Sequence, residues 1–259
     1  MSFDINKIRE KLAKMANRGQ GTQYWKPTLN SEVEIRLLSF PDVEGEPFKE
    51  LKFYYNIGKN RGLLAPSQFG DADPIQELID QLKGDNSEES KNLRKQLYPK
   101  SRFYAPIIVR GEEEKGVQIW GFSKTVYVQL YTWMATEEVG NITDPYTGRD
   151  MVITYTKPHG KQYPETTTRP RMSTSKAAST EAALKNVVDS IPKSSDLFSC
   201  KPYDELKKIV NDWINGDTEE EEAKDGTTRG GGSSGTDATK ELSGDYKSLD
   251  DAFNSLGKA

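Results

Sequence analysis

The chain has 259 residues, 34% of them hydrophobic and 29% charged, which fits one medium-sized domain with polar appendages better than two full cores. No stretch approaches 18 consecutive apolar residues and the charged N-terminus lacks a signal peptide's apolar run, so the sequence argues against a membrane protein and predicts a cytosolic one. With one cysteine, Cys200, and one histidine, His159, it excludes an internal disulfide and a four-ligand Cys/His zinc site, so no metal or cofactor is expected.

The formal net charge of -4 hides an asymmetry along the chain. Residues 217–259 contain 11 acidic and 5 basic side chains, whereas residues 1–216 contain 29 acidic and 31 basic ones. The last segment is also poor in large apolar residues, so it is predicted to be a disordered acidic tail. Only its end regains an apolar pattern, which indicates a protein-docking motif formed by Leu249, Asp250, Asp251, Phe253 and Leu256.

Residues 4–16 are predicted to form a short amphipathic helix, because apolar side chains recur there at spacings of three and four. Four basic residues surround the apolar stripe: Lys7, Arg9, Lys11 and Lys14. Gly19 and Gly21 end the helix as a hinge, so residues 1–21 are expected to form a basic arm for self-association. An ordinary capping helix is the alternative for the same pattern.

The pattern then changes to short β-type runs separated by turns. Five strands are predicted, at residues 33–38, 51–57, 104–109, 117–122 and 151–156. Helical spacing predicts four helices, at 74–82 with Asp73 as N-cap, 91–97, 180–188 and 203–213. The predicted fold class is therefore mainly β with helical insertions (α+β), and a five-stranded Greek-key barrel such as the OB-fold is expected in a core spanning residues 22–216.

Aromatic and basic side chains are interleaved in four blocks along this core. Flat rings accept any base face while Lys and Arg neutralise phosphates, so this pattern favours a groove that holds single-stranded nucleic acid without reading its bases. The candidate DNA-binding residues are Arg36, Lys52, Tyr54, Tyr55, Lys59, Arg61, Lys100, Arg102, Phe103, Tyr104, Trp120, Phe122, Lys124, Tyr155, Lys157, Arg169 and Arg171. The alternative is that these rings fill the core beside a solvated basic face, and for Arg36 that it forms a surface salt bridge.

Enzyme signatures are weak. The chain has no GxxxxGK[ST], HExxH or GxSxG motif, and His159 is better interpreted as an exposed basic neighbour than as a general base. Asp71, Asp73 and Glu77 are candidate Mg²⁺ ligands, although Asp73 is accounted for as a helix cap. The sequence therefore favours a non-enzymatic binding protein, with an RNA-binding regulator, a Mg²⁺-dependent nuclease or a protein–protein adaptor as alternatives.

Several motifs occur in a recognisable order: Trp25-Lys26, the Ile-Arg strand at 34–38, KSRFYAPIIV at 100–109, its partner strand at 117–124, and SLDDAFNSL at 248–256. Together they resemble the single-stranded DNA-binding, helix-destabilising proteins of T-even-type bacteriophages. The resemblance implies an OB-fold, an arginine at position 36 that contacts DNA, and cooperative coating of single-stranded DNA through the N-terminal arm. It also implies a tail that recruits phage replication and recombination proteins in the cytoplasm of the infected host.

Three departures from that family stand out. Its best-known member holds zinc through one histidine and three cysteines after the aromatic strand, whereas residues 64–76 here contain neither residue type. The compact Lys-Arg-Lys-Ser-Thr block of the family's arm is absent, which leaves the degree of cooperativity open. An arginine of the partner strand corresponds to Gly121, so one phosphate contact is expected to be missing.

Overall fold

The computed structural model describes residues 23–43, 45–60 and 62–215. In chain order its strands and α-helices are β1 (Tyr24–Trp25), β2 (Ser31–Leu37), β3 (Lys49–Tyr54), β4 (Leu63–Leu64), α2 (Pro74–Leu82), α3 (Glu88–Leu97), β5 (Lys100–Val109), β6 (Gln118–Phe122), α4 (Lys124–Met134), β7 (Arg149–Thr156), β8 (Glu165–Thr174), α5 (Glu181–Asp189) and α6 (Tyr203–Ile214). The predicted α+β class is confirmed.

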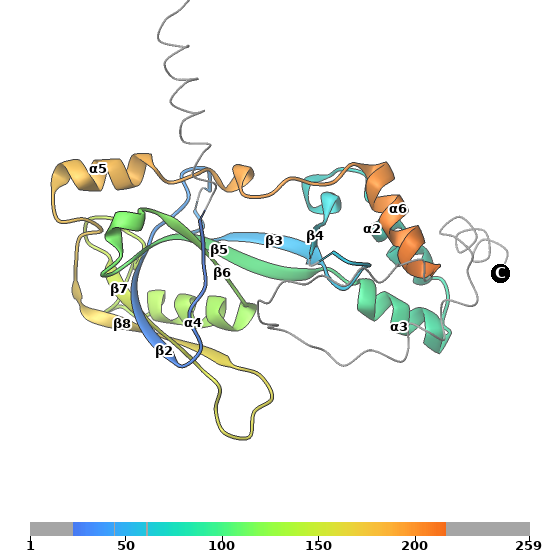
Figure 1. Ribbon diagram of the computed structural model, residues 1–259, viewed down its shortest axis with the longest axis horizontal. Coiled ribbons are helices and arrows are strands. Elements are labelled where there is room, and N and C mark those ends of the chain that lie inside the picture. The colour runs from blue at the N-terminus through green and yellow to red at the C-terminus, as the bar shows by residue number, and fades with distance from the viewer. Residues whose placement is uncertain (1–22, 44, 61, 216–259) are drawn as a thin grey trace, which may run out of the picture. The chain divides into compact units, whose positions relative to one another are not determined.

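Among the described residues the strands form one eight-stranded sheet in the order β1-β6-β5-β2-β7-β8, with β3 paired to β5 and β4 (Figure 1). Only β1 runs parallel to its neighbour, and β2 lies between β5 and β7, where Ile35 pairs with Val109 on one side and Met151 on the other. No described pairing closes this sheet, so the five-stranded OB barrel stays a prediction. No described helix is long and apolar enough to cross a membrane.

The described chain divides into two compact units built from interleaved segments. Unit 1 contains residues 23–49 and 103–197, and unit 2 contains residues 50–102 and 198–215, apart from the gaps at 44 and 61. Along the chain the stretches therefore alternate between unit 1 and unit 2. Each unit has its own hydrophobic core.

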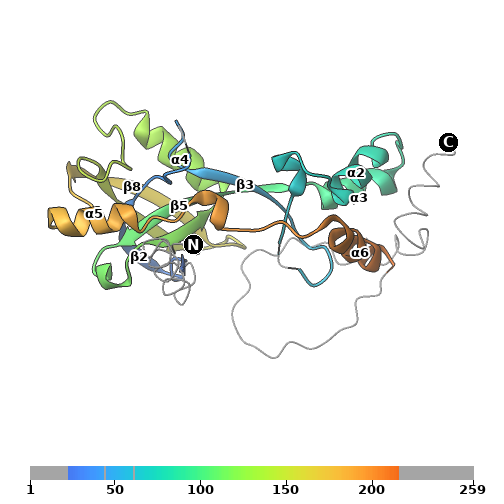
Figure 2. The ribbon, with the colours of Figure 1, turned by 90° about the horizontal axis from the view of Figure 1, so that it is seen from above.

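Unit 1 buries both faces of its sheet. On one face, Val126 and Leu130 of α4 pack with β-strand side chains that include Trp120. On the other, Leu184 of α5 packs against Leu38 and Ile108. Figures 1 and 2 show α4 and α5 on opposite sides of the strands. Because both faces are covered around Ile35 and Arg36, side chains of both alternating sets lie inside there, whereas most of β8 is exposed.

Side chains of α4 cover the outer edge of β8. The side-chain amide of Gln129 accepts a hydrogen bond from the Thr168 N–H at 2.9 Å and donates to the Thr166 carbonyl at 3.2 Å, as a peptide group of a neighbouring strand would. Trp133 Nε1 donates to the Thr168 carbonyl at 2.9 Å, and Pro170 has no N–H to offer. At these positions the backbone N–H and carbonyl groups of β8 that could pair with a further strand are therefore already hydrogen-bonded or absent.

Unit 2 is held by helices α2, α3 and α6, whose leucine, isoleucine and valine side chains form its core. Asp73 caps α2 as predicted: its Oδ1 accepts the N–H groups of Ile75 and Gln76 at 3.1 and 3.2 Å. Its Oδ2 accepts the Tyr54 hydroxyl at 2.7 Å and the Ser67 N–H at 3.2 Å. This buried carboxylate ties β3, the 3-10 turn Pro66–Phe69 and α2 together.

The four predicted helices are confirmed with small shifts at their ends, and the predicted hairpin around residues 111–116 is present. Four elements were not predicted: the two-residue strands β1 and β4, helix α4 and strand β8. Helix α4 is rich in β-branched and aromatic residues, which have low helix propensity, and β8 lies in a stretch interpreted only by its basic charge.

Candidate nucleic-acid interface

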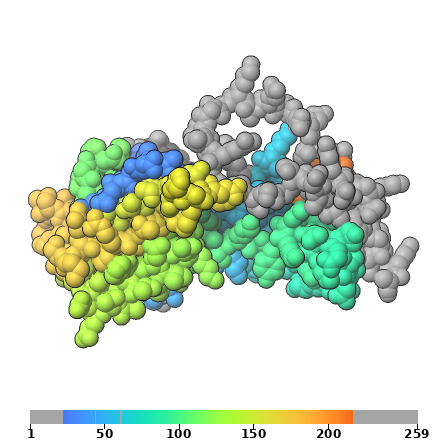
Figure 3. Space-filling model, turned by 90° about the horizontal axis from the view of Figure 1, so that it is seen from below, coloured from blue at the N-terminus to red at the C-terminus, as the bar shows by residue number. Residues whose placement is uncertain are grey.

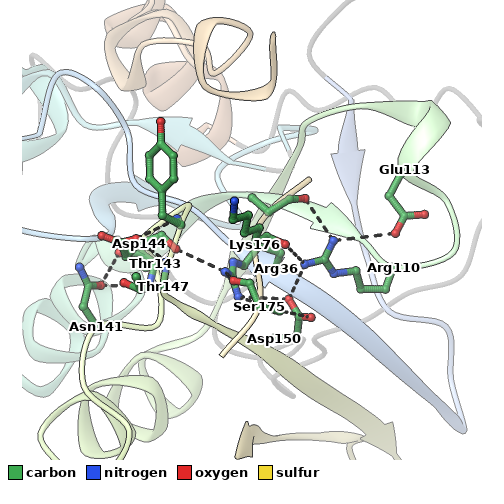
Figure 4. A network of polar contacts seen from close by, with 12 residues as sticks. Arg36, Arg110, Glu113, Asn141, Thr143, Asp144, Thr147, Asp150, Ser175 and Lys176 are labelled. Atoms are coloured by element: carbon green, nitrogen blue, oxygen red, sulfur yellow. Dashed lines mark hydrogen bonds and ion pairs between the residues drawn. The ribbon is translucent and has the colours of Figure 1, made fainter. Parts of the chain in front are cut away.

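Arg36, a predicted phosphate contact, is fully buried in unit 1 (Figure 4). Its Nη1 lies 3.2 Å from Asp150 Oδ1 and 3.1 Å from Ser175 Oγ, and its Nη2 donates to the carbonyls of Ser175 and Asp144. Burial lowers the pKa of this guanidinium, while Asp150 acts in the opposite direction. Strand alternation does put Arg36 on the face opposite Ile35, but α5 and residues 175–177 cover that face. The expectation of an accessible Arg36 is therefore corrected.

Most of the rings predicted to stack on bases fill the core instead. Trp120, Phe122 and Phe103 belong to the core of unit 1, with 2–4% of their surface exposed, and Tyr54 belongs to the core of unit 2. Phe103 stacks on Tyr127 at a centroid distance of 4.0 Å. These four rings do not reach the surface because a covering helix or neighbouring segment packs on each of them, so the interface proposed below omits them.

Tyr104 is 8% exposed, and its ring lies over Gly121, its cross-strand partner. A Cβ at position 121 would come within 2.8 Å of Tyr104 Cε1. Gly121 thus makes room for this ring, and Tyr104 is also omitted from the interface.

In unit 2, one predicted ring and one predicted cation lie together. Tyr55 is half-buried, and burial raises the pKa of its hydroxyl while the nearby charge of Arg102 acts to lower it. The Tyr55 ring also lies against Gly62, where a Cβ would stand 3.1 Å from Tyr55 Cε1. A partly exposed ring beside a guanidinium is an arrangement that can stack a base and hold its phosphate.

The same unit carries residues 90–102 of a basic stretch that the sequence analysis used only in part and that continues into unit 1. Residues 90–110 contain six Lys or Arg and no Asp or Glu. Lys95 and Lys100 are exposed, and Tyr98, at the end of α3, is 62% exposed, the highest value among the exposed aromatic side chains of the described residues. The absence of acidic residues over 21 positions was visible in the sequence and would have added Arg94, Lys95 and Tyr98 to the candidates.

In unit 1, the β7–β8 hairpin carries the second group of exposed candidates. Its tip projects beyond the sheet and is visible at the surface in yellow (Figures 1 and 3). Tyr155 is half-buried, Lys157 and His159 are exposed, and Tyr163 is 42% exposed. Lys161 pairs with Glu165, the one acid of the tip. Lys52 and Lys59 of unit 2 and Lys124 of unit 1 are exposed as well.

Arg169 and Arg171 lie on β8 and are each held by a carboxylate. Arg169 Nη2 is 2.8 Å from Glu32 Oε1, and Arg171 Nη2 is 2.7 Å from Glu34 Oε2. These two predicted phosphate contacts are at the surface, but their charges are balanced in this structure. Three sets of predicted residues lie outside the described part of the chain: Arg61, the four basic residues of the arm, and the docking motif of the tail.

The residues of this chain do not fit the zinc site of the resembling family. Cys200 is the only soft ligand near the insertion, and burial and the charges of Asp71 and Asp73 raise the pKa of its thiol. Both oxygens of Asp73 are occupied by the hydrogen bonds described above. Within residues 23–43, 45–60 and 62–215, no three His, Cys, Asp or Glu side chains gather as a metal site requires.

The chain matches a protein-family model over most of its described residues. The model described as "gp32 DNA binding protein like" matches residues 29–212, which include both units and every candidate discussed above except those in the arm and the tail. The chain belongs to this family. The gp32-like assignment agrees with the resemblance found in the sequence and makes the chain a member of a DNA-binding family. A search of curated proteins found no match.

Proposed function

We propose that this gp32-like protein binds single-stranded DNA without sequence preference and coats it. The observation that carries the proposal is the acid-free segment 90–102 of unit 2, with Tyr98 exposed and the charge of Arg102 acting on Tyr55. Rings and cations in this arrangement bind any single strand by stacking and phosphate neutralisation. Lys52, Lys59 and Lys100 are proposed to contact phosphates from unit 2, and Lys124, Tyr155 and Lys157 to contribute from unit 1.

The finer roles follow from the family and the sequence. We propose that the protein is not an enzyme and that it acts in phage DNA replication, recombination and repair in the host cytoplasm. The basic arm would support cooperative binding, and the acidic tail would recruit replication proteins. We also propose that unit 1 corresponds to the OB-fold implied by the resemblance, since its antiparallel strands and the helix α4 between β6 and β7 have the elements of such a fold.

The test of this function detects binding through a label on the DNA. Intrinsic protein fluorescence would report poorly on the surface, because Trp120 is buried. Labelled oligo-dT is titrated with the full chain, and fluorescence anisotropy is recorded at several salt concentrations, with duplex DNA and matched RNA as competitors. Tight binding is expected at low salt. The logarithm of the affinity should fall with the logarithm of salt concentration by about 0.7 per phosphate neutralised. No anisotropy change at low salt, or a preference for RNA or duplex, would contradict the proposal.

Tyr55→Ala is expected to weaken binding to oligo-dT by about 1–3 kcal/mol, since a stacked ring contributes this much per base. The anisotropy titration measures the change, and a thermal melt confirms that the variant is folded. Tyr146→Ala is the matched control, because Tyr146 is 52% exposed but lies in an acidic turn beside Asp144. Equal affinities for the two variants would remove Tyr55 from the interface.

A further inference from the structure

Two acidic residues share a sheet face with two of the predicted phosphate contacts. Strand β7 lies between β2 and β8, and the register places Glu32 opposite Thr154 and Thr154 opposite Thr167. Arg169 and Arg171 reach diagonally across β7 to Glu32 and Glu34, which leaves two ion pairs side by side. The face is covered where Arg36 lies, but at the two pairs all four side chains are 32–54% exposed.

These pairs cancel the charge that a nucleic-acid backbone would meet. A phosphate that approaches Arg169 or Arg171 has to displace a carboxylate held at 2.7–2.8 Å, and it then stays next to that carboxylate's negative charge. The hydrogen bond from Arg171 to Glu34 raises the pKa of this guanidinium. Removing the carboxylates costs little stability, because exposed ion pairs contribute little to folding.

We propose that Glu32 and Glu34 limit the affinity of this protein for single-stranded DNA by masking Arg169 and Arg171. The inference rests on the proposed function and deepens it: the two glutamates are affinity-limiting residues whose loss exposes a second group of cations on unit 1. A protein that coats DNA must also dissociate from it. With Arg169 and Arg171 masked, fewer cations neutralise phosphates, so the complex is weaker and its affinity depends less on salt than if all surface cations took part.

The experiment compares wild-type chain, Glu32→Gln/Glu34→Gln and a control with the same change in net charge, Asp80→Asn/Glu205→Gln. The control also breaks two exposed ion pairs, those of Lys83 and Lys201, but in unit 2. Glutamine keeps the size and an acceptor oxygen of each glutamate and removes only the charge. We expect the Glu32/Glu34 variant to bind oligo-dT about two- to five-fold more tightly per substitution, with a steeper salt dependence, and the control to change much less.

A second pair of variants separates unmasking from a general charge effect. Arg169→Gln/Arg171→Gln is expected to have little effect in the wild-type background but to abolish the gain in the Glu32→Gln/Glu34→Gln background. Equal affinities of the Glu32/Glu34 variant and the control, or a gain that survives loss of both arginines, would overturn the inference. Failure of the wild-type chain to bind oligo-dT at low salt would instead reject the proposed function, so the two failures are distinguishable.

Discussion

Asp150→Ala is expected to destabilise the protein by about 3–5 kcal/mol, the loss typical of breaking a buried ion pair from one side. Asp150 Oδ1 lies 3.2 Å from Arg36 Nη1 and 2.8 Å from Arg110 Nη2, and its Oδ2 accepts the Ser175 hydroxyl at 2.8 Å. Figure 4 shows this carboxylate between the two guanidinium groups. Without it, two arginines would face each other, and the fully buried one would lose the carboxylate it is paired with.

Chemical denaturation with a linear extrapolation measures this loss. Asp80→Ala is the matched control: this aspartate pairs with Lys83 at the surface, where the change should cost no more than about 1 kcal/mol. If the two aspartate variants were equally stable, Arg36 would not depend on Asp150, and the buried network would not hold residues 175–177 on the sheet.

Phe103→Ala is expected to cost about 3–5 kcal/mol of stability, which is the usual loss for a buried phenylalanine. The ring is 4% exposed, stacks on Tyr127 at 4.0 Å and lies parallel to Phe122 at 6.3 Å. Removing it would leave a cavity under α4, because the packed neighbours relax only partly. Urea denaturation gives the stability, and the oligo-dT titration is repeated at a temperature where the variant is folded.

The urea denaturation and the oligo-dT titration together decide whether the Phe103 ring packs in the core or stacks on bases. In the structure Phe103 supports the fold, so we expect a large loss of stability and an affinity for oligo-dT close to that of the wild-type chain. A variant as stable as wild type but about 1–3 kcal/mol weaker in binding would instead restore the sequence-based interpretation that Phe103 stacks on bases. Tyr55→Ala is expected to behave in the opposite way, with a small change in stability and a weaker affinity for oligo-dT.

The local elements of this protein could be predicted because their signals are local. Asp73 followed by Pro74 and a helical stripe predicts α2, and the structure confirms both the cap and the helix. The alternation around Ile35 predicts β2 and correctly puts Arg36 on the opposite face. The acid-free run at 90–110 and the acidic excess of residues 217–259 are likewise properties of composition alone.

The sequence left two matters open because they depend on residues far apart in the chain. Alternation gives the two faces of a strand but not what covers them: Arg36 is enclosed by Asp150 and Ser175, more than 100 positions later. The masking of Arg169 and Arg171 depends on glutamates 137 positions earlier.

Composition and periodicity thus determined most of this protein's longer elements, and the order of its motifs carried the family resemblance. Tertiary structure decided which rings and cations remain at the surface, because burial and ion pairing are set by long-range packing that no local pattern contains. Its two interleaved units show the same limit, since residues 50–102 pack with residues 198–215 and no signal near either segment indicates the other.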